Sequence, residues 1–77
     1  MPQQINFFNR SLIDNITLKF GQHSYKDIEF IEEIIQLLDL NDFIDSLPKG
    51  LDSNLGDKIQ NMSGGQKQRI SIARALF

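Results

Sequence analysis

The sequence lacks several features on which small proteins often depend. Its 77 residues include no cysteine, no tryptophan and a single histidine. Disulfide bonds and thiolate metal sites are therefore excluded, and His23 has no second histidine or cysteine with which to share a metal. No hydrophobic run reaches transmembrane length, and residues 1–6 have neither the basic nor the apolar region of a signal peptide. We expect one small, soluble globular unit of modest stability.

Charge is unevenly distributed along the chain. The net charge is −2, from 10 acidic and 8 basic residues, but three of the basic residues and none of the acidic ones follow residue 62. Those three, Lys67, Arg69 and Arg74, fit a solvated helix face, and the glycine-rich helix start beside them also favours a role facing phosphate. Nucleic-acid binding has little support, because the rest of the chain is acidic and its aromatic residues are not interleaved with basic ones.

Helix signals recur along the sequence. Ser11 is a candidate N-cap for a short helix, and Ser24 is a candidate N-cap for the next one. A further short helix, opening at residues 41–42, stops before Pro48, because the residue before a proline is disfavoured in the helical region. The clearest amphipathic pattern, from Tyr25 to Leu38, has one stripe at Ile28, Ile31, Ile35 and Leu38, with Ile34 and Leu37 beside it.

These signals divide the single unit into four segments. Residues 1–9 are expected to be extended or loop, residues 10–46 several helices with a loop at residues 17–24, residues 47–62 a connector, and residues 63–77 a last helix. Only the first eight residues could supply a β-strand, and a lone strand would have no partner. The predicted fold is therefore all-α, a small bundle of about four helices.

The last helix begins at the only segment that indicates a chemistry. Ser63 can act as its N-cap, and Gln66, three residues later, can complete a capping box. Gly64 and Gly65 leave the first turn without side chains, so its unpaired N–H groups stay open to a ligand, and the helix dipole adds about half a positive charge there. A phosphate is the anion that this helix start favours most.

The residues from Met62 to Leu76 resemble the signature motif of the ABC-transporter ATPases. In that family the motif is usually Leu-Ser-Gly-Gly-Gln, followed by a basic helix start and Ala-Arg-Ala-Leu. Here it reads Met-Ser-Gly-Gly-Gln-Lys-Gln-Arg-Ile-Ser-Ile-Ala-Arg-Ala-Leu. Methionine in place of the leucine is a change of similar volume and polarity, so we expect little effect from it.

The resemblance continues over the whole chain. Pro2–Gln3 and Ser11–Ile16 are similar to the Q-loop and the helix after it in ABC exporters. Residues 47–59 are similar to the exporter loop that touches the membrane domains, although Asp57 stands where a glutamate is usual and Ile59 where a glycine is common. The resemblance implies the helical subdomain of an exporter-type nucleotide-binding domain, from the Q-loop to the signature motif.

For the signature residues, the resemblance implies contacts with ATP in a longer protein. In the family, two ATPase domains meet head to tail, and the signature of one closes on the ATP held by the P-loop of the other. Ser63 and Gly65 would then contact the γ-phosphate, and Gly64 would allow the close approach. Gln66 would contact the nucleotide or serve only as the capping-box partner.

Other matched residues have both a functional and a structural interpretation. Gln3 would reach Mg²⁺ or the attacking water in the longer protein, with its neighbour Gln4 as the alternative; each is otherwise an exposed polar residue near a terminus. Phe7 and Phe8 belong either to the core or to a groove that receives a coupling helix of the membrane domain. The three basic residues of the last helix are expected to form ion pairs with other parts of the longer protein.

The same resemblance shows what catalysis would still need. No glycine begins the P-loop pattern of Gly, four residues, Gly, Lys and Ser or Thr, and no apolar run ends in Asp-Glu. ATP and Mg²⁺ are therefore expected in the longer protein, at the cytoplasmic face of a membrane, and the chain alone should bind neither tightly and hydrolyse no ATP. The expected partners are the rest of the ATPase domain, a second ATPase domain and the transmembrane domains, reached through the Q-loop and residues 47–59.

Two other functions stay open. A non-transport ABC ATPase would share the signature, but the repair ATPases insert long coiled coils before it, whereas Gln3 and Ser63 are only 60 positions apart. A free-standing helical binding module would use the same anion site with no role related to ATP. Tight ATP binding by the isolated chain would support this second alternative.

Overall fold

The structure, a computed structural model, describes residues 6–56 and 58–77. Within these ranges the chain forms helices and turns and contains no β-strand. The elements in chain order are α1 (Leu12–Thr17), α2 (Tyr25–Leu37), α3 (Asn41–Asp45), the 3₁₀ turns η1 (Gly50–Asp52) and η2 (Ile59–Asn61), and α4 (Gly64–Leu76). The prediction of an all-α fold with about four helices is confirmed. No described helix is both long and apolar enough to cross a membrane.

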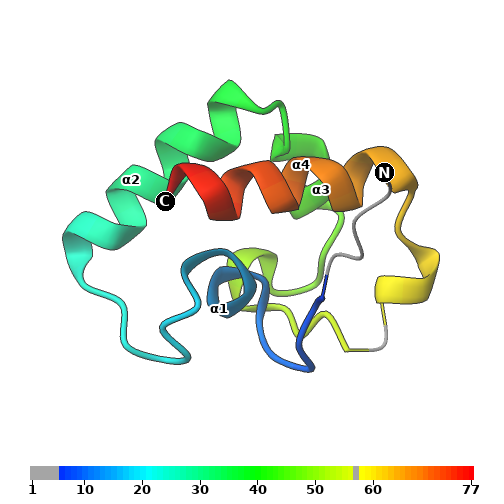
Figure 1. Cartoon of the computed structure of the whole chain (residues 1–77), viewed down its shortest axis with the longest axis horizontal. Helices are drawn as coiled ribbons and strands as arrows, with labels where there is room; N and C mark the ends of the chain where they lie inside the picture. Colours follow the sequence, from blue (N-terminus) through cyan, green and yellow to red (C-terminus); the bar gives the residue numbers. More distant parts are fainter. Residues whose placement is uncertain (1–5, 57) are drawn as a thin grey trace.

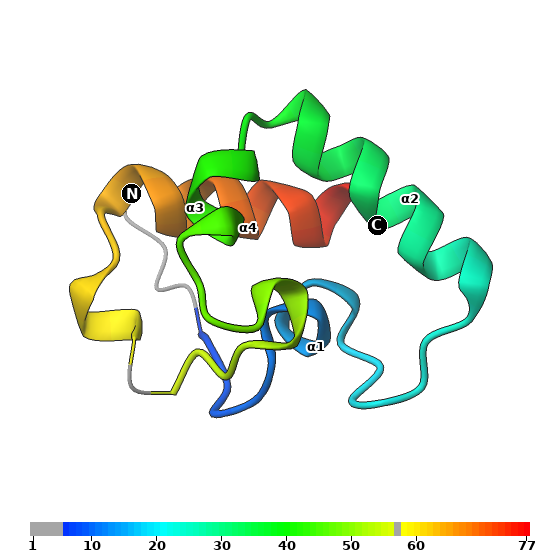
Figure 2. The same ribbon diagram turned by 180° about the vertical axis from the view of Figure 1, so that it is seen from behind.

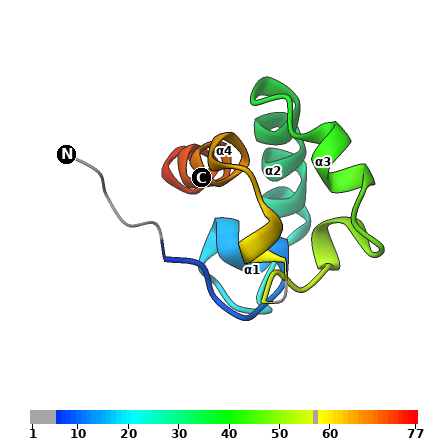
Figure 3. The same cartoon turned by 90° about the vertical axis from the view of Figure 1, so that its right-hand side faces the viewer.

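The bundle is organised around α4. This helix packs against α2 on one side and against α1 on another, as the views in Figures 1 and 3 show together. Seen from behind in Figure 2, η1 lies between α1 and α3 and contacts both. The shared core consists of Leu12, Ile13, Ile16, Ile31, Ile34, Ile35, Leu40, Leu47, Leu55, Met62, Ile70 and Ala73.

Serine caps begin the helices where the sequence predicts them. The Ser11 hydroxyl accepts a hydrogen bond from the Asp14 N–H at 3.1 Å, and the Ser24 hydroxyl accepts one from the Asp27 N–H at 3.2 Å. Asp27 returns the interaction, because its carboxylate accepts from the Ser24 N–H at 3.1 Å and completes a capping box. These caps were predictable because capping depends on residues three positions apart.

The buried face of α2 is narrower than the sequence predicts. Ile31, Ile34 and Ile35 are buried, but Ile28 is 37% exposed and Leu37 is 75% exposed. The predicted apolar face is therefore wrong at Ile28, which belongs to the stripe, and at Leu37, which lies beside it. The reason is that α4 covers α2 on one side only, so apolar residues away from that side reach the surface.

Asp14 of α1 ties the following loop to the helix. Its Oδ1 accepts a hydrogen bond from the Gly21 N–H at 2.8 Å and lies 3.3 Å from Nε2 of His23, which in turn is 2.8 Å from the Thr17 hydroxyl. Its Oδ2 accepts from Nε of Arg10 at 3.2 Å. Burial by itself raises the pKa of Asp14, but the hydrogen bonds from Gly21, Arg10 and Ser11 outweigh it and hold the pKa below its usual value.

We expect the substitution Asp14→Asn to lower the free energy of unfolding by about 1–3 kcal/mol at pH 7, because it weakens hydrogen bonds to a buried carboxylate. Since the folded-state pKa is depressed, this carboxylate stabilises the fold above its ordinary pKa near 3.8 and loses that effect as the pH falls through the folded value. Urea unfolding at pH 7 and at pH 3 should therefore show a smaller pH dependence in Asp14→Asn than in the wild type. An equal loss of unfolding free energy between pH 7 and pH 3 in both proteins would show that Asp14 is not a source of acid sensitivity.

Candidate functional site

The start of α4 has the geometry predicted for an N-capped helix. Ser63 has extended backbone angles, φ −68° and ψ 159°, and its hydroxyl accepts a hydrogen bond from the Gln66 N–H at 3.0 Å. The Gln66 side-chain oxygen accepts from the Ser63 N–H, also at 3.0 Å, so the capping box is complete. Met62, just before this start, is buried in the core and anchors it.

Nothing within the described chain requires glycine at positions 64 and 65. A Cβ atom built on Gly64 meets no atom within 4 Å, and one on Gly65 meets only the Ser63 hydroxyl at 3.9 Å. Neither residue has the positive φ that favours glycine, whereas glycine in a helix costs up to about 1 kcal/mol relative to alanine. Their small size therefore suits a close approach from outside the chain.

The first turn of α4 offers backbone donors to that approach. The N–H groups of Gln66 and Lys67 are already bonded, to the Ser63 hydroxyl and to the Ser63 carbonyl at 3.0 Å. Within residues 6–56 and 58–77, those of Gly64 and Gly65 have no acceptor, as expected for the first turn of a helix. Both glycines are exposed, and the helix dipole adds positive potential there. This arrangement of donors and potential is of the kind that suits an anion, so the start of α4 is the candidate anion site.

The three cations of α4 do not act together. Arg69 is exposed and Lys67 is half-buried, but Arg74 turns toward α1 and donates from Nε to the Asn15 carbonyl at 2.9 Å. Burial lowers the pKa of Arg74 from its usual value. The expectation that all three form ion pairs outside the chain misses this internal contact, which no sequence spacing indicates because 59 positions separate the partners.

Only some of the other predicted site residues lie in the described part of the chain. Gln3 and Gln4 lie outside the described residues, so their predicted roles stay predictions. Phe7 packs against the core, whereas Phe8 is 40% exposed and meets the Phe20 ring edge-on at 5.4 Å. The described part of the chain contains no group of three histidine, aspartate or glutamate residues that could hold a metal.

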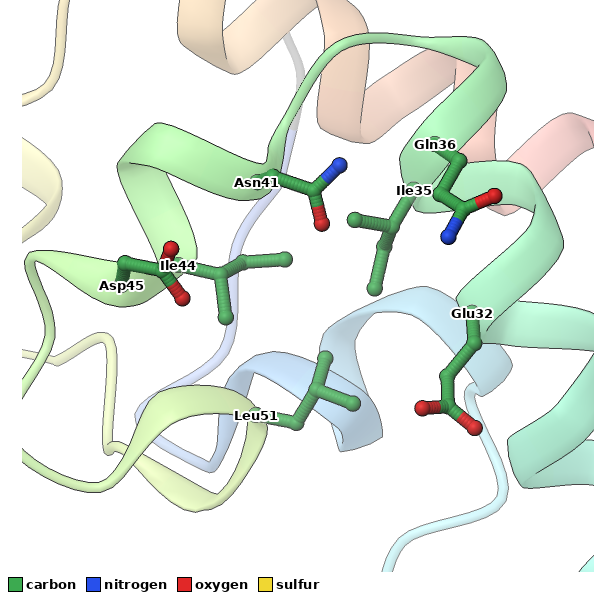
Figure 4. Close-up of a pocket in the computed structure, with 7 residues that line it drawn as sticks. All are labelled: Glu32, Ile35, Gln36, Asn41, Ile44, Asp45 and Leu51. Carbon is green, nitrogen blue, oxygen red and sulfur yellow. The ribbon is translucent and has the colours of Figure 1, made fainter.

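A separate cavity opens on another face of the bundle, between α2, α3 and η1 (Figure 4). It has a volume of about 210 Å³ and contains none of the residues that begin α4. Its floor is apolar and its rim carries two carboxylates and two amides, from the residues Glu32, Ile35, Gln36, Asn41, Ile44, Asp45 and Leu51. This cavity is therefore separate from the candidate anion site at Ser63.

Asn15 is the important residue that sequence reasoning missed. Its side chain is fully buried, and Nδ2 donates to the carbonyls of Phe8, Arg10 and Ser11 while Oδ1 accepts from the Phe8 N–H at 2.8 Å. One signal was present in the sequence. Asn15 lies two positions after Ile13 and one position before Ile16, and a buried amide between two core residues is normally hydrogen-bonded.

The fold and the site together define a small helical unit with a candidate anion site at the start of its last helix. Comparison with known proteins identifies the family: the ABC transporter profile matches residues 1–77, and the chain belongs to the ABC transporter family.

Similar proteins carry the segment within much longer chains. The whole chain is 42% identical to a putative export ATP-binding/permease protein of Rickettsia bellii, of which it covers 13%. It is 35% identical to an ATP-dependent lipid A-core flippase of Ralstonia nicotianae, again covering 13%, and 42% identical to multidrug resistance protein 1 of Plasmodium falciparum, covering 5%. The chain therefore spans only a small part of the length of these relatives.

Proposed function

We propose that this chain is the signature-bearing helical subdomain of an exporter-type ABC ATPase. In the full-length protein, meaning the product of the coding sequence that contains this segment, α4 closes on ATP held by a second ATPase domain. The Ser63 hydroxyl and the Gly65 N–H contact the γ-phosphate, Gly64 permits the approach, and Gln66 holds the capping box. Hydrolysis of that ATP is then coupled to transport.

The open start of α4 is the observation that carries the proposal. It combines a fixed N-cap, two exposed glycines with no packing role and unpaired N–H groups, which is the chemistry that recognises a phosphate. The sequence supplies no P-loop and no Asp-Glu strand, so ATP and Mg²⁺ must be held by other parts of the full-length protein. Gln3 would act there on Mg²⁺ or on the attacking water.

A second surface supports coupling to membrane domains. Leu18 and Phe20 have φ of 59° and 47°, a left-handed conformation that costs roughly 1–2 kcal/mol per residue for a side chain of this kind. Both are more than 40% exposed, and the Phe20 ring meets the exposed Phe8 ring edge-on, so these two rings form an apolar surface. A strained backbone that exposes apolar side chains supports a docking surface for a helix of the transmembrane domain.

The connector joins that surface to the rest of the subdomain. The Leu55 N–H donates to the Arg10 carbonyl at 2.9 Å, and the Leu12 N–H donates to the Ser53 carbonyl at 2.8 Å. Residues 53–55 therefore lie along the segment that leads into α1. This supports the proposal that the Q-loop side and the connector contact the transmembrane domains together.

We expect the full-length protein to hydrolyse ATP in the presence of Mg²⁺ and the isolated 77-residue chain to release no phosphate above background. Phosphate release and ATP binding by calorimetry, measured on both proteins, test this difference. Tight ATP binding by the isolated chain would instead support a free-standing binding module, and membrane-spanning segments in the full-length protein would decide for an exporter over a non-transport ABC ATPase.

A further inference from the structure

The side chain of Asn15 holds the segment between Phe7 and α1 together through hydrogen bonds. Four hydrogen bonds of its side chain, between 2.8 and 3.3 Å, join it to the backbone of Phe8, Arg10 and Ser11. The residue is 0% exposed, so these hydrogen bonds are shielded from solvent. The segment Phe7–Asn15 therefore behaves as one rigid piece, because moving any of its turns breaks buried hydrogen bonds.

Arg74 attaches this piece to α4. Its Nε donates to the Asn15 main-chain carbonyl at 2.9 Å, and its guanidinium lies 5.6 Å from the centre of the Phe7 ring and 5.9 Å from that of Phe8. The Nη2 atom is buried, with no acceptor in the part of the chain that the structure describes. One planar cation thus contacts both ends of the segment, which the flexible ammonium of a lysine cannot reproduce.

We infer that Arg74 is a positioning residue, which through the Asn15 carbonyl holds the segment Phe7–Asn15 and the signature helix α4 as one body. This inference rests on the proposed function, because it concerns the orientation of the same phosphate-contacting helix. The segment begins four residues after Gln3. Arg74 therefore couples any movement on the Q-loop side to a movement of α4.

Loss of this contact has a specific kinetic consequence. A loosely oriented α4 still carries Ser63 and Gly65, but it closes on the γ-phosphate less favourably, so more ATP is needed to populate the closed state. ADP has no γ-phosphate, and its affinity for the P-loop should not change. A defect that merely reduced the amount of folded protein would lower kcat and leave KM unchanged.

The experiment measures kcat and KM for ATP, the inhibition constant of ADP and the thermal midpoint of the full-length protein carrying Arg74→Met, Arg74→Lys or Lys26→Met. We expect Arg74→Met to raise KM about fivefold, equivalent to about 1 kcal/mol, with ADP inhibition unchanged. Arg74→Lys should lie between Arg74→Met and the wild type. The control, Lys26→Met, removes the same charge from an exposed position of α2, away from the start of α4, and should keep KM within about twofold.

The outcomes separate this inference from the proposed function. A wild-type protein without ATP hydrolysis would refute the proposed function itself. An active wild type with unchanged KM in Arg74→Met would overturn the positioning role and leave the proposed function standing. If Arg74→Met does not fold, Arg74→Lys decides: a rise in KM of about twofold or more supports the role, and an unchanged KM overturns it.

Discussion

The substitution Gly65→Asp should lower ATP turnover by the full-length protein by about 100-fold or more, because its side chain would keep the γ-phosphate away from the backbone N–H of residue 65, and one preorganised donor to a reacting oxyanion is worth a factor of that size. The new carboxylate would lie where the γ-phosphate is expected, so it adds repulsion to the loss of close approach. Steady-state phosphate release at saturating ATP measures this effect.

The same substitution should not weaken the fold. Position 65 lies in the first turn of α4, where a Cβ atom meets nothing closer than 3.9 Å. Aspartate is favoured over glycine there by the helix dipole, by about 0.3–1 kcal/mol. The isolated 77-residue chain should therefore unfold at the same temperature as the wild type or slightly higher, which separates the loss of activity from any loss of structure.

A matched control places the same charge one turn farther along α4. Gln68 is exposed and its side chain has no hydrogen bond to the described part of the chain, so Gln68→Asp should leave turnover within a few-fold of the wild type. Equal activity in Gly65→Asp and the wild type would contradict the phosphate contact. Equal losses in both variants would point to a general charge effect on α4.

The substitution Asn15→Ala should lower the free energy of unfolding by about 2–4 kcal/mol, because it leaves buried backbone groups unsatisfied and creates a cavity. The Phe8 N–H loses its acceptor, whereas the Arg10 carbonyl keeps its bond from the Leu55 N–H. A chain of this size has little stability in reserve, since proteins typically total about 5–15 kcal/mol and small domains lie low in that range. Chemical unfolding followed by circular dichroism measures the change.

An asparagine at the surface provides the control for this prediction. Asn41 begins α3 and is exposed, so Asn41→Ala should change the free energy of unfolding by no more than about 0.5 kcal/mol. If Asn15→Ala were as stable as Asn41→Ala, the hydrogen bonds of Asn15 would not be a determinant of the fold. The rigid link that Arg74 makes between the segment Phe7–Asn15 and α4 would then lose its basis.

The parts of the fold that follow from nearby residues could be predicted from the sequence. Ser11, Ser24 and Ser63 cap helices because a side-chain oxygen reaches the N–H three positions ahead, which is a property of the local sequence. The candidate anion site was found for the same reason. Its glycines and its capping pair lie within four consecutive residues.

The parts that depend on distant contacts could not be predicted. The exposure of Ile28 and Leu37 is set by where α4 crosses α2, and helical periodicity does not contain that information. In the same way, the spacing of Arg74 along α4 predicts a cation at the surface. It donates to the Asn15 carbonyl only because α1 packs against α4. Predicting either would have required the packing of helices that are far apart in the sequence.

The most direct test of the account is to photolabel the full-length protein with ATP that carries an aryl azide on its γ-phosphate. Trypsin cuts after Lys58 and Lys67, so a label near the start of α4 is recovered on the peptide Ile59–Lys67 and can be mapped by mass spectrometry. The account predicts labelling of this peptide in the wild type, its loss in Gly65→Asp and its absence from the isolated chain. Labelling of the peptide at the same level in Gly65→Asp, or its absence from an active wild-type protein, would contradict the claim that this helix start meets the γ-phosphate.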